Sequence, residues 1–431
     1  MIMKKVVNIG LVGLGNIGSY FYKYFNNIRN EVFYKTGKRV VIKYVSAKNK
    51  RKKRNYLKNC IWVNNPNELA KKHDVDILVE LIGGNSSYVK NLVLLALKNN
   101  KHVITANKSL IASYGHELSL TAQKRNVNLL FEASVAGGIP LIKFINEGLI
   151  GNKITKLCGI LNGTSNFILS RMSKSEKNFK EVLIEAKNNG YAESNPLLDI
   201  NGFDVFSKIK ILSSLCFNNV IQNNKILLEG IEKIKRDDIV NADQLGYAIK
   251  LVGFTEIKKK SLFERVHPVL VKKNSYIANI DNALNAIIIN ANPIGQSILQ
   301  GEGAGQGPTT SALISDLYSI LNDDVKKGFG LSISLKKKIK PFNFLNHICS
   351  AYMRINVSDK PGVLSSLSKV LAKNKISIKR VIQIPNKKKN AANIVIISHH
   401  ASEKNYQICI NQLTKKKYVL ERPTFIRIEI I

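Results

Sequence analysis

The sequence predicts an α/β protein with a parallel sheet in its N-terminal part and a smaller α+β module at its C-terminal end. An apolar strand at residues 6–12 runs into a G-x-G-x-x-G pattern at 13–18 and then into a helix. Strands and helices keep alternating to about residue 133, which is typical of parallel sheets with helical crossovers. Residues 350–431 show the order βαββαβ instead. We therefore predict an N-terminal Rossmann domain, a central α+β domain and a C-terminal ferredoxin-like module.

The glycine pattern is the first of these elements, with its helix expected to end near Phe25. Gly13 permits a tight turn, Gly15 lets backbone amides approach a pyrophosphate, and Gly18 packs helix against strand. The helix N-terminus adds a favourable dipole for phosphate. A strand–helix turn without ligand is the alternative, and the position between a strand and a helix argues against it. The residues expected to contact a dinucleotide here are Gly13, Leu14, Gly15, Asn16, Ile17 and Gly18.

The second strand, predicted at residues 40–45, ends without an acidic residue. NAD-specific versions of this unit usually place an acid here to bind the ribose 2′-hydroxyl. This chain has Lys48, Lys50 and Arg51 instead, which could meet a 2′-phosphate. The cofactor is therefore expected to be NADP or NAD, with NADP favoured.

The α/β alternation then continues, and polar residues gather where its strands end. Ligands of such sheets bind beyond the carboxyl ends of the strands. Gly83, Thr105, Lys108 and Glu132 lie at or near such ends, so Lys108 is expected to face the cofactor or the substrate. The predicted helices are 66–73, 86–99 and 110–125, and the predicted strands are 76–82, 102–106 and 127–133.

Composition limits what kind of protein this can be. The 431 residues are 45% hydrophobic and 22% charged, a length that suggests two or three domains. No apolar run reaches the roughly 18 residues of a membrane span, and a strand follows the first residues with no room for a signal peptide. The five cysteines have no paired spacing, which favours reduced thiols in a cytoplasmic protein.

The formal net charge is +36. Taken alone, this value favours a polyanionic partner such as nucleic acid. The charge is mostly lysine, however, and it is spread over the whole chain without aromatic residues between the bases. We interpret it as a compositional bias, with no specific nucleic acid as partner.

The middle of the chain changes character after Ser134. A glycine-rich turn leads to a predicted helix at 141–150, and a strand at 154–161 precedes Asn-Gly-Thr-Ser-Asn and a helix ending near Met172. Thr164 or Ser165 is expected to cap that helix. The glycine-rich run at 301–308 precedes a helix at 309–321, and it is expected to approach a ligand or another backbone closely. Residues 323–349 have little pattern and suggest a linker.

Residues 189–212 bring the carboxylates of Glu193, Asp199 and Asp204 close in sequence to the amine of Lys208. Asn-Pro and Asn-Gly turns suggest that Glu193 and Asp199 lie on a loop, and the apolar spacing after Gly202 predicts a helix. That helix would hold Asp204 and Lys208 on one face at i, i+4. The alternative is an exposed ion pair of little energetic value. Hydride delivery to a carbonyl carbon needs a proton donor and positive charge near the oxygen, which lysines can supply.

Taken together, these motifs resemble homoserine dehydrogenase in its single-function form with a C-terminal ACT domain. The resemblance covers essentially the whole chain. It implies an NAD(P)-binding domain at 1–133, a catalytic and dimerisation domain at 134–322, a linker at 323–349 and an ACT domain at 350–431. The matching stretches are 10–18, 105–108, 132–140, 159–166, 190–193, 199–204, Lys208, 266–268 and 301–312.

The resemblance implies interconversion of L-aspartate 4-semialdehyde and L-homoserine with NAD(P)H. Lys208 would exchange a proton with the substrate's C4 oxygen, with Asp204 orienting it or holding a water. Glu193 would bind the α-amino group, and Asp199 and Tyr191 would also contact the substrate. Lys108 would contact nicotinamide and substrate. The other cofactor residues implied are Lys48, Thr105 and Gly303, and the positions matching a monovalent cation site, Na⁺ or K⁺, are Glu132, Val135, Gly137 and Ile139.

Regulation and assembly also follow from the resemblance. ACT domains bind amino acids at interfaces between paired modules, so threonine feedback is implied, in a homodimer or homotetramer without a membrane partner. A purely structural module is the alternative. Residues 194–197, Ser-Asn-Pro-Leu, are less acidic than the family pattern. Other readings are a different Rossmann dehydrogenase of an amino-acid pathway, for which no cysteine lies in a suitable motif, and a basic nucleic-acid-binding regulator.

Overall fold

The chain folds into two units, and several elements run from one into the other. A computed structural model describes residues 6–50, 52–84, 86–192, 195–222, 226–385 and 390–431. The first unit comprises residues 1–157, 207–223 and 289–339, and the second comprises 158–206, 224–288 and 340–431. The predicted α/β class is confirmed in the first unit.

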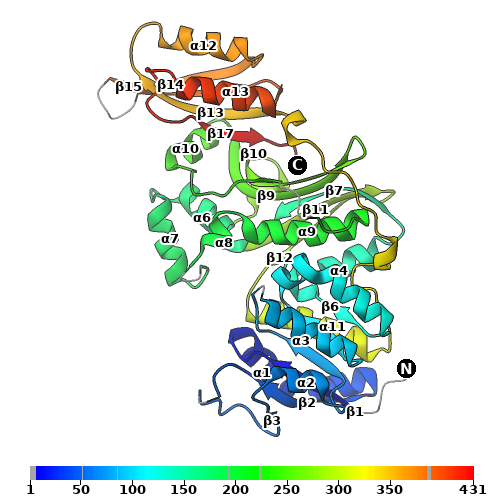
Figure 1. Ribbon diagram of the computed structural model, residues 1–431. Coiled ribbons are helices and arrows are strands. Elements are labelled where there is room, and N and C mark those ends of the chain that lie inside the picture. The colour runs from blue at the N-terminus through cyan, green and yellow to red at the C-terminus, as the bar shows by residue number, and fades with distance from the viewer. Residues whose placement is uncertain (1–5, 51, 85, 193–194, 223–225, 386–389) are drawn as a thin grey trace. The chain divides into compact units, whose positions relative to one another are not determined.

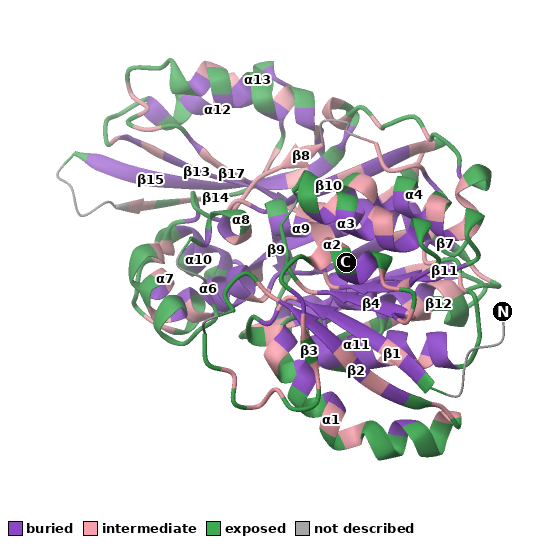
Figure 2. Ribbon diagram, turned by 60° about the horizontal axis from the view of Figure 1, so that its bottom comes forward, coloured by how far each residue is buried: buried purple, intermediate pink, exposed green. Residues whose placement is uncertain are grey.

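The first unit is built on a parallel six-stranded sheet in the order β3-β2-β1-β4-β5-β6. This is the strand order of the doubly wound dinucleotide-binding fold. Parallel strands covered on both faces are apolar along their length, and β4 is buried at all four positions. Figure 2 shows the buried colour along β1. The strands are β1 Val6–Val12, β2 Arg39–Ser46, β3 Ile61–Trp62, β4 Ile77–Glu80, β5 His102–Thr105 and β6 Leu129–Leu130.

Helices pack on this sheet, and their starts follow from local chemistry. The side chains of Asn65, Ser86 and Asn107 each accept a hydrogen bond from a backbone amide in the first turn of the following helix. A late helix, α11, packs against α1 and adds Leu313 and Leu317 to the core. The helices are α1 Asn16–Thr36, α2 Pro66–Lys71, α3 Ser87–Lys98, α4 Lys108–Lys124 and α11 Gln306–Leu321.

Three predicted elements of this unit were wrong in extent. The first helix does not end near Phe25 but continues to Thr36, because Val32 is still buried and the left-handed Gly37 ends it. The strand predicted at 127–133 shrinks to β6, since the chain turns into a 3₁₀ helix at Glu132–Ser134. The helix predicted at 141–150 is only α5 Leu141–Lys143, followed by a π-helical turn at Phe144–Gly148.

The remaining strands form a second, largely antiparallel sheet, most of which belongs to the second unit. The strand order is β11-β7-β9-β10-β17-β13-β15-β14, with β12 beside β11, β8 beside β10 and β16 beside β13. The strands are β7 Lys153–Ile160, β8 Leu227–Leu228, β9 Tyr247–Lys258, β10 Ser261–Lys272, β11 Leu284–Asn292, β12 Gly295–Glu302, β13 Ile348–Ser358, β14 Ile378–Pro385, β15 Ala391–Ser398, β16 Ala401–Ser402 and β17 Thr424–Ile428. The helices are α6 Gly163–Lys174, α7 Phe179–Asn188, α8 Leu197–Ile200, α9 Phe203–Phe217, α10 Arg236–Gln244, α12 Val363–Lys373 and α13 Glu403–Thr414.

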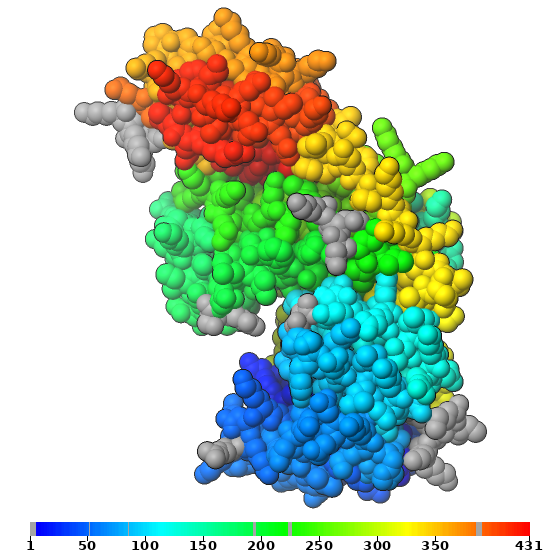
Figure 3. All heavy atoms as spheres, in the orientation of Figure 1, coloured from blue at the N-terminus to red at the C-terminus, as the bar shows by residue number. Residues whose placement is uncertain are grey.

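The predicted βαββαβ module is confirmed, with a short additional strand, β16. Its last strand does more than complete the module, because β17 lies between β10 and β13. It pairs parallel to β10, with Val269 opposite Arg427, and antiparallel to β13. Figures 1 and 3 show the orange and red module directly against green residues of the same unit. The module is therefore hydrogen-bonded into the sheet of the second unit.

Buried ion pairs reinforce this junction. The Arg427 guanidinium, 1% exposed, contacts the Glu403 carboxylate at 2.6 Å and the Glu229 carboxylate at 2.8 Å. The Arg265 guanidinium contacts Glu429 at 3.2 Å. Burial alone would raise the pKa of Glu429, but Arg265 and His347 hold it well below its usual range. Removing one partner of such a pair typically costs about 3–5 kcal/mol, because a buried charge is left uncompensated.

The segment predicted as a linker has defined structure in its first part. Phe329 is fully buried, and its ring lies 4.9 Å from that of Phe131 and 5.0 Å from that of His116. The Lys336 amine donates to the Ser214 carbonyl at 2.7 Å. Short 3₁₀ turns follow at Ile333–Leu335 and Phe344–Asn346.

The composition also led to expectations about disulfides and membrane-spanning helices. All five cysteines are free thiols, as expected. Among the residues that the structure describes, no helix combines the length and apolar character needed to cross a membrane.

Candidate active site

The glycine loop of the first unit has the geometry of a phosphate-binding turn. Gly13 has φ +98°, and a Cβ there would lie 2.4 Å from the Leu81 carbonyl oxygen. A Cβ on Gly18 would lie 1.9 Å from the Gly13 carbonyl oxygen. At Gly15, in contrast, no atom lies within 4 Å of an added Cβ. Gly13 and Gly18 are thus required by the fold, whereas Gly15 leaves open space beside the N-terminus of α1, which suits a bound pyrophosphate.

The end of β2 is basic and exposed, as predicted. Lys48 and Lys50 are exposed, and Arg51 lies outside the described residues. The Arg54 guanidinium donates to the Asn49 carbonyl at 2.7 Å and lies 5.4 Å from the centre of the Trp62 ring. No acidic residue stands between Ser46 and Arg54 in the sequence.

A buried hydrogen-bond chain fixes the ends of β4 and β5. The Thr105 hydroxyl donates to the Glu80 carboxylate at 2.6 Å, and the other Glu80 oxygen accepts the Ile82 amide at 2.7 Å. The Asn107 side chain then donates to the Gly84 carbonyl and caps α4. Burial raises the pKa of Glu80, while these donors oppose the rise. Thr105 is fully buried, so its hydroxyl holds this edge of the sheet in place.

Lys108 was expected between a strand and a helix beginning at residue 110. It is instead the first residue of α4 and is half-buried, because Asn107 caps the helix two residues earlier than predicted. The glycine-rich run at 301–308 does approach another backbone closely, as predicted. The Gly138 amide donates to the Glu302 carbonyl at 3.1 Å, and a Cβ on Gly137 would lie 2.5 Å from the Gly303 carbonyl oxygen.

The loop with the predicted cation ligands is tightly turned. Ala136 and Gly137 both have positive φ, 59° and 50°. The buried Glu132 carboxylate accepts the backbone amides of Ile142 at 2.8 Å and Lys143 at 2.9 Å, so it caps α5. Burial raises the pKa of Glu132 to about 7. Val135 and Ile139 are buried on either side of the turn.

In the second unit, one amide joins two of the predicted acids. The Asn162 Nδ2 donates to the Asp199 carboxylate at 2.8 Å and to the Asp204 carboxylate at 2.9 Å. The Asn162 Oδ1 accepts the Ser165 amide at 2.8 Å and the Ser165 hydroxyl at 2.7 Å. The helix α6 is therefore capped by Asn162, not by Thr164 or Ser165 as predicted. Asp204 is 5% exposed, so the two carboxylates meet at a sheltered position.

The surroundings of Asp199 differ from the predicted loop. Asp199 lies in the short helix α8, whose first turn follows Pro196, a residue with a fixed helical φ. The Thr164 hydroxyl donates to the Tyr191 carbonyl at 2.6 Å and lies 3.3 Å from the Asp199 carboxylate. The Tyr191 ring packs against the Phe167 ring at a tilt of 31°, with the ring centres 4.7 Å apart. Glu193 lies outside the described residues.

The helix predicted after Gly202 is confirmed as α9, and it carries Asp204 and Lys208 one turn apart. Lys208 is 7% exposed, so the exposed surface pair considered as the alternative is excluded. Asp199 and Asp204 belong to the second unit, whereas Lys108 and Lys208 belong to the first.

Sequence reasoning missed two residues that organise these sites, Glu80 and Asn162. Glu80 was taken as part of an apolar strand, although an acid at a strand end is itself a signal of a buried polar network. Asn162 stands three residues before Ser165, the spacing of a helix cap, and this signal was assigned to the wrong residue.

A parallel sheet of this order, with a glycine loop that leaves room only at Gly15, defines a nicotinamide-dinucleotide-dependent oxidoreductase. Three family models match successive parts of the chain. The model described as homoserine dehydrogenase, NAD binding domain, matches residues 13–132, that of homoserine dehydrogenase matches 140–318, and that of the ACT domain matches 351–415.

Individual proteins are similar along the whole chain. Homoserine dehydrogenase of Neisseria gonorrhoeae is 38% identical over 433 residues, with 99% of both chains covered. That of Helicobacter pylori is also 38% identical, covering 99% of this chain and 100% of that one. The crystal structure of a homoserine dehydrogenase from Thiobacillus denitrificans is 34% identical, with a TM-score of 0.91 and 98% of both chains covered. The chain belongs to the homoserine dehydrogenase family.

Proposed function

We propose that this chain reduces L-aspartate 4-semialdehyde to L-homoserine, with Lys208 as the proton donor. The observation that supports this role is the burial of Lys208 on α9, one turn after an acid held by Asn162. The nicotinamide cofactor supplies the hydride to the aldehyde carbon. The Lys208 ammonium gives its proton to the oxygen of that carbon, which becomes the hydroxyl of homoserine.

We assign the other predicted residues to binding and orienting the substrate. Asp204 orients the Lys208 amine or a water beside it. Asp199 and Glu193 bind the substrate ammonium, with Tyr191 beside them, because carboxylates suit a cationic amine. Lys108 contacts both the nicotinamide and the substrate, and its charge favours the oxygen as negative charge develops there.

Replacing Lys208 tests the proposal. Lys208→Ala should lower kcat for homoserine oxidation by about 10²–10⁴-fold, the usual contribution of a positioned acid or base. The dissociation constant for NADPH, measured by fluorescence titration, should change less than about threefold. Lys208→Arg is the matched control for charge, and it should remain inactive because guanidinium does not release its proton. Normal turnover by the alanine variant would contradict the role.

We propose NADP as the preferred cofactor, with Lys48 beside the 2′-phosphate. The exposed lysines after β2 and the lack of an acid there support this preference. Lys48→Glu should lower the ratio of kcat/KM for NADPH to that for NADH by about tenfold, because one charged contact to phosphate is replaced by repulsion. Lys71→Glu, on α2, is the control for a change in net charge. An unchanged ratio would remove Lys48 from the site.

Three properties follow from the resemblance and remain proposals. A monovalent cation, Na⁺ or K⁺, binds in the turn formed by Val135, Gly137 and Ile139 beside Glu132, whose positive φ angles at 136 and 137 are suited to exposing carbonyls. L-Threonine acts as a feedback inhibitor through the ACT domain. The protein forms a homodimer or homotetramer in the cytosol, a location that free thiols also favour.

A further inference from the structure

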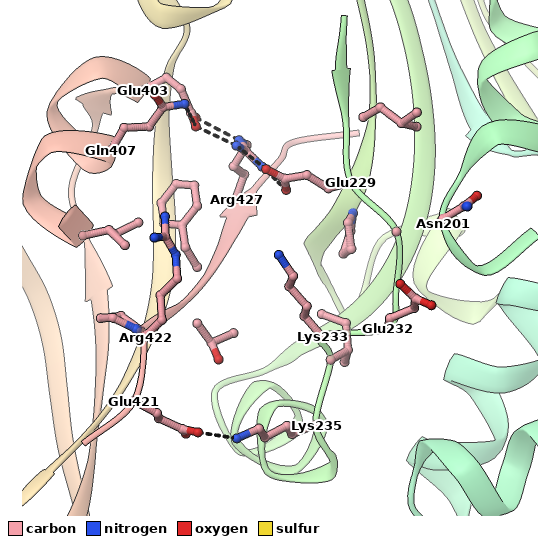
Figure 4. Close-up of a pocket in the computed structure, with 18 of the residues that line it drawn as sticks. Asn201, Glu229, Glu232, Lys233, Lys235, Glu403, Gln407, Glu421, Arg422 and Arg427 are labelled. Atoms are coloured by element: carbon pink, nitrogen blue, oxygen red, sulfur yellow. Dashed lines mark hydrogen bonds and ion pairs between the residues drawn. The ribbon is translucent and has the colours of Figure 1, made fainter. Parts of the chain in front are cut away.

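Glu80, the last residue of β4, is a buried carboxylate without a cationic partner. Two other buried acids of this chain have one. The Glu403 carboxylate contacts the Arg427 guanidinium at 2.6 Å (Figure 4). The Asp238 carboxylate contacts the Arg354 guanidinium at 2.7 Å. Glu80 is fully buried too, yet within the described part of the chain no lysine, arginine or histidine forms an ion pair with it. A charge removed from water in this way is costly unless another charge compensates it.

The hydrogen bonds of Glu80 suit the ionised form. One carboxylate oxygen accepts the Thr105 hydroxyl at 2.6 Å, and the other accepts the backbone amides of Ile82 at 2.7 Å and Gly83 at 3.4 Å. All three partners donate, so a protonated carboxyl group would add a fourth hydrogen without an acceptor. These donors oppose the rise in the pKa of Glu80 that burial causes.

The loop that follows Glu80 lies beside the phosphate-binding turn. The Leu81 carbonyl oxygen is the atom that a Cβ on Gly13 would meet at 2.4 Å. Ile82 is 41% exposed, and at Gly83 and Gly84 no atom lies within 4 Å of an added Cβ. An exposed apolar side chain beside two open glycines leaves space for a flat ring.

The strand order indicates which half of the cofactor this loop meets. In sheets of the order β3-β2-β1-β4-β5-β6, a dinucleotide lies across the carboxyl ends of the strands, with its pyrophosphate at the turn after β1. The residue that binds the adenosine ribose in such folds follows β2, so the adenosine half lies on that side. The nicotinamide half therefore lies on the side of β4 and β5, the strands that end at Glu80 and Thr105.

We propose that Glu80 determines how strongly this protein prefers the oxidised cofactor over the reduced one. The nicotinamide ring carries a positive charge when it is oxidised and none when it is reduced. The Glu80 carboxylate therefore attracts only the oxidised ring, which supplies the cationic partner that the protein does not. Glu80 is fully buried, so it acts through its charge and not by contact.

The same charge acts on the reaction, a consequence that rests on the function proposed above. Hydride donation by the reduced cofactor turns its neutral ring into a cation. A buried negative charge nearby stabilises the positive charge that develops there. Glu80 thus shifts the equilibrium on the enzyme toward the oxidised cofactor and the alcohol.

Dissociation constants of the oxidised and reduced cofactors, measured by calorimetric titration of the full-length protein, test the proposal. Within each pair, NADP⁺ with NADPH and NAD⁺ with NADH, the ratio of the two constants cancels the contacts of the phosphates and the adenosine. Glu80→Gln keeps the size of the side chain and removes its charge. It should raise the dissociation constant of the oxidised form relative to that of the reduced form by about tenfold. The result does not depend on the preference for NADP proposed above, because the change should appear in each pair that binds.

Two matched variants separate this charge effect from a general loss of affinity. Gly15→Ala, at the phosphate-binding turn, should raise both dissociation constants by the same factor and leave their ratio unchanged. Asp76→Asn removes a negative charge from the opposite end of the same strand, where the Asp76 carboxylate accepts the Asn8 amide at 2.8 Å. It should also leave the ratio unchanged, since the cofactor binds at the carboxyl ends of the strands.

A purely structural role for Glu80 predicts a different result. If Glu80→Gln weakens both forms equally, or lowers only the melting temperature, Glu80 merely holds the end of β4 and the proposal is overturned. If Glu80→Gln does not fold, the double variant Glu80→Leu/Thr105→Val carries the same test, because it removes both partners of the buried hydrogen bond together. A ratio equal to that of the wild type in this variant would overturn the proposal as well.

Discussion

At the scale of single residues, the Asn162 side chain forms hydrogen bonds to both Asp199 and Asp204. One side-chain amide donates to two carboxylates, while its oxygen accepts two bonds from Ser165. Two acids brought this close repel each other, and a shared donor reduces that repulsion. Hydrogen bonds to charged groups contribute about 1.5–3 kcal/mol each. Asn162 therefore acts as a positioning residue for Asp199 and Asp204.

We expect Asn162→Ala to lower kcat/KM for homoserine by about 10–100-fold, which corresponds to the loss of one such bond. Most of the change should be in KM, because the carboxylates meet the substrate ammonium.

Asn178→Ala is the matched control for this prediction. Asn178 caps α7, so its loss should cost about 1 kcal/mol of stability without changing the kinetics. A purely structural role for Asn162 would lower the melting temperature and leave the KM for homoserine unchanged.

Sequence reasoning placed Asp204 and Lys208 correctly because their relation is local to one helix. It could not find Asn162, whose partners lie 37 and 42 residues away in the chain. Nor could it place Asp199 in α8, since Asn-Pro and Asn-Gly are turn signals and a four-residue helix between them has no periodicity.

At the scale of elements, the three glycines of the loop at residues 13–18 have different roles: two are needed for packing, and one leaves room for a ligand. Gly13 and Gly18 face backbone at distances no side chain could occupy, and Gly15 faces open space. The backbone at Gly15, with φ −74° and ψ −159°, is also accessible to other residues. The same motif therefore contains two glycines that packing geometry requires and one that only a bound phosphate would require.

Two alanine variants test this distinction. Gly15→Ala should leave the melting temperature within about 2 °C of the wild type but raise the dissociation constant of NADPH about tenfold or more, because a methyl group occupies the place of the pyrophosphate. Gly13→Ala should cost about 2–3 kcal/mol, since its φ is strained for alanine and Leu81 blocks the Cβ.

Differential scanning calorimetry and cofactor titration measure both effects. If Gly15→Ala destabilises the protein as much as Gly13→Ala does, Gly15 is required by folding and the distinction fails.

The strand–helix alternation was predictable because hydrophobic period and turn residues are local signals. The ends of the helices and strands were less predictable than their order. The continuation of α1 to Thr36 depends on burial of Val32 against partners elsewhere in the fold, and the shortening of β6 depends on Glu132 turning back to cap α5.

At the scale of the whole molecule, the strands of the ACT module belong to the same sheet as β9 and β10. The order βαββαβ was visible in the sequence, but the pairing of β17 with β10 was not, because residues 269 and 427 are far apart in the chain. The pairing makes removal of the module a poor test of regulation. Deleting it would also remove a neighbour of β10 and Glu429, one of the two acidic partners of Arg265.

A chain ending near residue 340 should therefore melt well below the full-length protein, by about 5 °C or more, or aggregate. Loss of a partner of a buried charge alone costs about 3–5 kcal/mol, and roughly 2–4 °C accompanies each kcal/mol in a domain of this size. Scanning fluorimetry and size-exclusion chromatography of both chains check this. Equal melting temperatures and monodisperse truncated protein would show that β17 contributes little to the second unit.

The place of β17 also has a consequence for synthesis of the protein on the ribosome. The first unit's strands β1 to β6 all precede residue 131, so their sheet can form early. The larger sheet, in contrast, includes β17 at Thr424–Ile428, which lies between β10 and β13. Until those residues emerge, β10 beyond its pairing with β8 and β13 on one side present unpaired edges, the kind of surface on which nascent chains associate wrongly. This sheet is therefore complete only after translation of residues 424–428, and we expect the folding yield to depend on chaperones that cover strand edges until then.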